Sequence, residues 1–125
     1  MRLVYLLSAL CLALAGCNRI SVPTDSGIVG TVVIGPTCPV EMPGLDCADK
    51  PYQATLTVLT ISSDKVTRFT TDEDGEFRVN LAPGDYILHP ESPDDMGLPY
   101  GVEQPFTVRE GQFTELRVMY DSGIR

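Results

Sequence analysis

The sequence lacks tryptophan, has one histidine and is poor in basic side chains. Nine Lys and Arg stand against seventeen Asp and Glu, a formal net charge of −8 over 125 residues. Binding to nucleic acid or adsorption on anionic lipid requires a basic face, so this balance argues against both. The longest run of almost wholly apolar or small residues, 3–16, has fourteen residues, whereas a membrane-spanning helix needs about 20. We therefore expect no transmembrane helix.

The same scarcity argues against catalysis. A zinc peptidase needs several His and Glu ligands, and His89 is alone. Nucleophilic catalysis needs a base beside the nucleophile, and no motif places one next to any serine. We therefore predict that the protein is not an enzyme.

The N-terminal apolar run ends in Leu14-Ala15-Gly16-Cys17. This ending resembles the signal of bacterial lipoproteins, in which Cys17 receives a diacylglyceryl group and becomes the new N-terminus. The alternative is an ordinary secretory signal with Cys17 a bystander thiol. We predict a signal peptide over residues 1–16, a lipidated N-terminus and tether over 17–26, and a folded domain over 27–125. Because two acyl chains anchor a protein stably, we expect it on the outer side of the bacterial cell membrane or on the outer membrane.

Two of the four cysteines remain for the folded domain, since Cys11 lies in the signal and Cys17 would carry lipid. Cys38 and Cys47 lie in a stretch rich in Pro and Gly, and in an exported chain they predict a disulfide. A metal site would need more ligands than two thiols, and a redox pair usually has the spacing C-x-x-C.

From residue 27 onward the apolar residues alternate with a period of two, which predicts β-strands. Frequent Gly and Pro turns separate seven such segments, so we predict a single all-β, seven-stranded antiparallel β-sandwich. The expected strands cover residues 27–34, 53–61, 65–71, 76–81, 85–89, 104–109 and 112–120, the last two forming a closing hairpin. The side chains expected in the core are Ile28, Val32, Ile34, Ala54, Leu56, Val58, Phe77, Val79, Leu81, Tyr86, Leu88, Phe106, Val108, Leu116, Val118 and Tyr120.

Two segments resemble the transthyretin-like, or carboxypeptidase regulatory-like, sandwich family. They are GIVGTV over residues 27–32 and TDEDGEFRVNLAPGDY over 71–86. The resemblance implies a prealbumin-like sandwich in which Tyr86 packs its ring and reaches a backbone partner. Members commonly serve as accessory, stalk or ligand-contacting modules of exported proteins. The hydrolase branch uses several histidines and a C-terminal tetrapeptide with Tyr and Arg, which this chain matches only loosely.

Acidic residues surround Gly75 in the middle of that run. Asp72, Asp74 and Glu76 are weak candidates for a calcium site, which needs six or more oxygen ligands; Asp94 and Asp95 would have to contribute as well. The alternative is a plain turn, because Asp and Gly are favoured in turns for backbone reasons. We predict no resident cofactor or metal.

Recognition in sandwiches is commonly carried by loops on a rigid frame. Two long segments are candidates, residues 35–52 and 89–103. Their apolar residues include Met42 and Leu45 in the first, and Met96, Leu98 and Tyr100 in the second. Either these side chains contact a partner, or they fold back and cap the end of the sandwich.

The sequence therefore predicts a lipid-anchored, non-catalytic, monomeric module of the cell envelope. It would bind an envelope protein or act as a structural accessory. The alternatives are a carbohydrate or cell-wall binder, against which the missing tryptophan argues, a calcium binder, and, less favoured, a transthyretin-like hydrolase.

Removing the expected disulfide should leave the fold intact but less stable. A closed loop of about ten residues predicts a loss of about 2.5–3 kcal/mol of unfolding free energy. The measurement is thermal unfolding of Cys38→Ser and of the unchanged protein with and without reductant. If reductant leaves the melting temperature of the unchanged protein where it was, the pair is not a stabilising disulfide.

Overall fold

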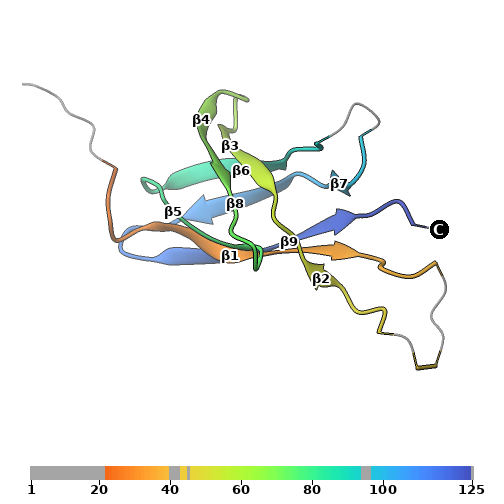
Figure 1. Ribbon diagram of the computed structural model, residues 1–125. Helices are drawn as coiled ribbons and strands as arrows, with labels where there is room; N and C mark the ends of the chain where they lie inside the picture. The colour runs from red at the N-terminus through yellow and green to blue at the C-terminus, as the bar shows by residue number, and fades with distance from the viewer. Residues whose placement is uncertain (1–21, 40–42, 45, 94–96, 125) are drawn as a thin grey trace, which may run out of the picture.

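Two β-sheets packed face to face form the domain (Figure 1). The computed structural model describes residues 22–39, 43–44, 46–93 and 97–124, and these contain nine strands. The first sheet contains β1 (Gly27–Gly35), β2 (Lys50–Pro51), β5 (Glu76–Asn80), β7 (Tyr100–Gly101) and β9 (Phe113–Asp121). The second sheet contains β3 (Thr55–Thr60), β4 (Lys65–Thr70), β6 (Gly84–Pro90) and β8 (Gln104–Val108). The predicted all-β sandwich is confirmed.

Strand β1 lies between neighbours on both of its edges. Along one edge it pairs with β9 over its whole length, from Gly27 opposite Phe113 to Gly35 opposite Asp121, and this pairing is parallel. Along the other edge it pairs antiparallel with β5 and then with β2. The expectation of an entirely antiparallel sandwich is therefore wrong for this one pair.

The expected closing hairpin is also wrong. Strand β8 pairs with β6 in the second sheet, whereas β9 pairs with β1 and β7 in the first. The turn at Glu110 and Gly111 therefore connects the two layers instead of two neighbouring strands. Strand β9 then runs in the same direction as β1.

All seven expected strands are present, with bounds that differ by at most two residues. The structure adds β2 and β7, two-residue strands inside the segments expected to be loops. They extend the first sheet at its two opposite edges: Pro51 pairs with Val33, and Gly101 with Tyr120. The count is nine strands instead of seven.

Every side chain expected in the core belongs to the buried cluster between the sheets or packs against it. Tyr86 behaves as its motif predicts, because its ring stacks on Phe106 and its hydroxyl donates to the Ala82 carbonyl at 2.6 Å. Two further aromatic rings join the cluster without having been expected there. Phe69 packs against Phe77 at 5.2 Å between ring centroids, and Tyr52 against Tyr120 at 5.0 Å.

Gly30 permits the close approach of the strands beside β1. A Cβ at this position would overlap the Leu116 carbonyl oxygen of β9 and lie 2.8 Å from the ring of Phe77. A side chain here would therefore push apart the central pair and the core, which explains why a glycine interrupts an otherwise β-branched strand.

Cys38 and Cys47 form the predicted disulfide, with Cα atoms 5.3 Å apart. It lies in the segment between β1 and β2. Because β2 and β7 pair with the C-terminal ends of β1 and β9, both long segments reach the same end of the first sheet. In the described part of the chain, no helix is long and apolar enough to cross a membrane.

Candidate functional site

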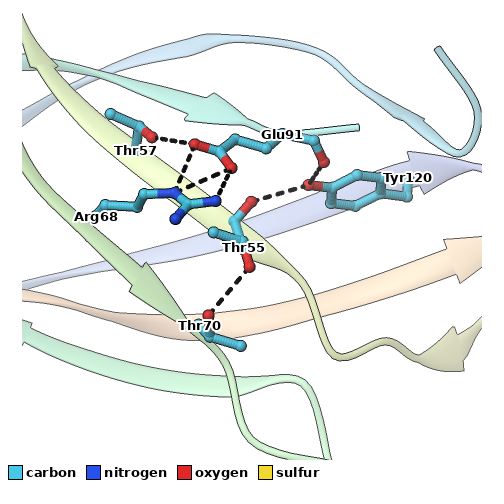
Figure 2. Close-up of polar contacts among 6 residues, drawn as sticks. All are labelled: Thr55, Thr57, Arg68, Thr70, Glu91 and Tyr120. Atoms are coloured by element: carbon cyan, nitrogen blue, oxygen red, sulfur yellow. Dashed lines mark hydrogen bonds and ion pairs between the residues drawn. The ribbon is translucent and has the colours of Figure 1, made fainter. Parts of the chain in front are cut away.

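A polar cluster covers the outer face of the second sheet where β6 ends (Figure 2). Arg68, on the edge strand β4, donates to the carboxylate of Glu91, the residue directly after β6. Its Nε lies 3.0 and 3.1 Å from the two carboxylate oxygens, and its Nη2 lies 2.8 Å from Oε2. This two-pronged contact fixes the planes of both groups, which a single contact to a lysine would not do.

Thr57 holds the same carboxylate from beneath. It lies on β3, between β4 and β6, and its hydroxyl donates to Glu91 Oε1 at 2.7 Å. Although Thr57 is on the outer face, only 7% of its surface is exposed, because the Arg68–Glu91 pair covers it. Strand register brings the cluster together, because β3 pairs with β4 on one side, where Thr57 lies opposite Arg68, and with β6 on the other.

The main chain of Glu91 is held from the opposite side, within the core. The Tyr120 hydroxyl donates to the Glu91 carbonyl at 2.7 Å and lies 3.5 Å from the Thr55 carbonyl, as Figure 2 shows. The Glu91 amide donates to the Thr55 carbonyl at 3.0 Å. Burial is the main cause that raises the pKa of Tyr120 above its ordinary value, so this hydroxyl stays protonated and remains a donor.

The electrostatics of Glu91 follow from these contacts. The hydrogen bonds from Arg68 and then from Thr57 lower the pKa of Glu91 from 4.5 to about 2, while partial burial opposes the shift. The glutamate is therefore ionised at neutral pH, and the pair carries no net charge.

A polar pocket of about 330 Å³ opens beside this pair. We call it the Arg68 pocket. Its lining residues are Tyr52, Gln53, Ala54, Thr55, Arg68, Glu91, Ser92 and Pro93.

The outer face of the first sheet has a different character. Val33 on β1 lies between Pro51 on β2 and Met119 on β9, and Met119 shares a shallow hollow with Val102. We call these four residues the apolar row. Met119 is 45% exposed, Val102 64% and the neighbouring Tyr100 52%. Such a group is unusual on the solvent side of a sandwich, where polar residues normally alternate with the core.

The residues predicted for partner contact are placed only in part. Tyr100 on β7 is exposed and borders the apolar row. Leu98 is also partly exposed, and its side chain lies against the backbone at Gly123, where an added Cβ would be 2.8 Å away. The predicted lipidation site Cys17 and the predicted contact residues Met42, Leu45 and Met96 lie outside the described residues.

The acidic turn uses its first carboxylate to hold its own backbone. Asp72 Oδ1 accepts hydrogen bonds from the amides of Asp74 at 2.9 Å and Glu76 at 2.8 Å, and Gly75 has a φ of 73°. Among the described residues, no three His, Cys, Asp or Glu side chains are grouped for metal binding. Asp94 and Asp95 lie outside that part of the chain.

Sequence reasoning missed Arg68, Glu91, Val102 and Met119. Arg68 and Glu91 are 23 residues apart, and no local pattern links them. Met119 was an outward residue of an expected strand, but only the pairing with β1 and the position of Val102 show that it belongs to a group.

Neither a described protein family nor a curated protein matches this sequence. A solved structure does match in fold: a mutant of the shaft pilin SpaA from Lactobacillus rhamnosus GG, with a TM-score of 0.55 and 13% sequence identity. The match covers 78% of this chain and 50% of the pilin chain, so this protein spans about half the length of that chain. At this identity the likeness concerns the sandwich fold.

The Arg68–Glu91 pair makes a pH-dependent contribution to stability. Because folding lowers the pKa of Glu91 from 4.5 to about 2, its contribution is present above pH 4.5 and is lost as the pH falls towards 2. We expect Glu91→Gln to lower the unfolding free energy by about 1–2 kcal/mol at pH 7. The difference in unfolding free energy from the unchanged protein should shrink below pH 4.5, measured by denaturant unfolding at a series of pH values.

Glu73→Gln, in an exposed turn, is the control and should change stability by less than about 0.5 kcal/mol. A Glu91→Gln deficit that stays constant down to pH 3 would contradict the assignment.

Proposed function

We propose that the protein is a lipid-anchored, non-catalytic module of the bacterial cell envelope that binds another envelope protein through the apolar row. The observation that carries the proposal is the exposure of Tyr100, Val102 and Met119 around one hollow at the first sheet, Val102 lying in the connection between β7 and β8. Aromatic residues and methionine are enriched in protein interfaces, where they supply large contact areas.

Three features support a location outside the cytoplasm. The disulfide between Cys38 and Cys47 is of a kind that persists in oxidising compartments. The N-terminal segment ends in the lipoprotein-like motif at Cys17. The sandwich is similar in fold to part of a shaft pilin, and its 71–86 run favours the transthyretin-like class.

A non-catalytic role is supported by the way in which the reactive side chains are engaged. His89 Nδ1 lies 2.7 Å from Glu103 Oε1 on the surface, and Cys38 and Cys47 are joined to each other. The carboxylate of Glu91 is neutralised by Arg68 instead of standing poised as a base. These contacts favour binding over turnover.

The anchor is tested by comparing two cysteine substitutions. Cys17→Ser should move the protein from the membrane fraction to the soluble fraction and abolish labelling by an alkyne-bearing fatty acid. Cys11→Ser is the matched control, because this cysteine lies in the segment that processing would discard, and it should leave both readouts unchanged. A Cys17→Ser protein that is still labelled and bound to membranes would show that this residue is not the lipid attachment site.

The binding surface is tested by crosslinking on intact cells followed by mass spectrometry. Met119→Glu and Val102→Glu should each reduce at least tenfold the capture of the partner that the unchanged protein captures. A change at the centre of an interface typically costs about 2 kcal/mol or more of binding free energy. Ile61→Glu is the control, because Ile61 is a similarly exposed apolar residue in the turn after β3. Equal capture by all three variants would rule out the apolar row as the contact.

A further inference from the structure

We infer that the Arg68 pocket is a binding site for a neutral sugar of a surface glycan. The inference deepens the proposed binding function and rests on it for the location of the protein outside the cytoplasm. It concerns the second sheet, and is therefore independent of the apolar row on the first.

The polar groups of the pocket are already held in place before any ligand arrives. Arg68 and Glu91 fix each other through three contacts of 2.8–3.1 Å, and Thr57 adds a fourth to the carboxylate. Gln53 is held by a hydrogen bond from its Nε2 to the Thr71 carbonyl at 3.1 Å. A ligand therefore binds without ordering these long side chains, which would otherwise cost about 0.5–1.5 kcal/mol for each.

These lining residues keep hydrogen-bonding capacity beyond the contacts that fix them. Within the described residues, the contacts of Arg68 use Nε and Nη2, which leaves both hydrogens of Nη1 to donate. The amide of Gln53 uses a hydrogen of Nε2, which leaves its Oε1 to accept. Donors and acceptors fixed around one pocket match the hydroxyl groups of a sugar ring, each of which both donates and accepts.

The charge of the pocket favours a neutral ligand. Arg68 and Glu91 compensate each other, so the described lining residues present neither an uncompensated cation nor an uncompensated anion to a ligand. The chain as a whole carries a formal charge of −8, which repels anions further. Because the charges within the described lining are balanced, the pocket favours a neutral polar ligand over an ion.

The pocket also has an apolar side and a suitable size. Its lining includes Ala54 and Pro93 beside the polar residues. Apolar lining of this kind can contact the C–H face of a sugar while the polar groups take its hydroxyls. The volume of about 330 Å³ is at the lower end of ligand sites, which suits one or two sugar rings of a longer chain.

The test is a titration of the full-length protein in detergent micelles, followed by NMR or calorimetry. The probes are two neutral trisaccharides, the β-1,4-linked N-acetylglucosamine trimer and maltotriose. We expect at least one to bind with a Kd of about 1 mM, as is usual for a small, open site with few hydrogen bonds. Arg68→Lys, which keeps the charge but loses the planar fork, and Gln53→Ala should each weaken binding at least fivefold.

The controls separate the pocket from the fold and from the anchor. Lys65→Met, on the same strand, removes a charge outside the pocket and should leave the affinity unchanged. Thermal unfolding of each variant shows whether a loss of binding comes from a loss of structure. Because micelles hold the protein with or without lipidation, a failure of sugar binding does not bear on the anchor at Cys17.

Three results would overturn the inference. The first is no binding of either trisaccharide at about 20 mM, far above the expected Kd. The second is binding that Arg68→Lys and Gln53→Ala leave unchanged while both variants remain folded. The third is tighter, salt-sensitive binding of glucuronate, because the pocket would then select an anion.

Discussion

The parallel pairing of β1 with β9 is the constraint on which the rest of the structure depends. It runs the whole length of both strands and is possible because Gly30 lets the backbone of β9 approach. It places Tyr120 in the core, where its hydroxyl reaches across to the Glu91 carbonyl in the other layer. Glu91 in turn orients Arg68, so the geometry of the Arg68 pocket follows from a pairing on the opposite sheet.

The two outer faces of the sandwich are built from different chemistry. On the second sheet, Thr57, Arg68 and Glu91 satisfy one another and leave a polar pocket without net charge. On the first sheet, register gathers Val33, Pro51 and Met119 into a row that is continued by Val102. One rigid frame therefore carries an exposed apolar row at one sheet and a polar pocket at the other, so the two proposed binding sites are separate.

Much of the fold was predictable because strand patterns are local. The alternation that placed Leu56 and Val58 inward is a property of neighbouring residues, and so is the turn chemistry around Gly75. The pairing of Cys38 with Cys47 followed from counting cysteines. What failed was long-range: β8 and β9 were joined as a hairpin because adjacent strands usually pair, whereas they belong to different sheets. The candidate sites were less predictable: Tyr100 was a candidate for partner contact or for capping the sandwich, and no local pattern connected Arg68 with Glu91.

By itself the sequence determined that the layers are β-sheets, which residues form the core, which cysteines form the disulfide, and that the chain is acidic. These depend on the period of apolar residues, on the positions of Gly and Pro and on composition, all of which are read without knowing which strands meet. Only the tertiary structure decided the parallel pair, the short strands β2 and β7, the apolar row and the Arg68–Glu91 contact. The physical reason is that each of these brings together residues distant in the chain, through a register set by packing both sheets around one core.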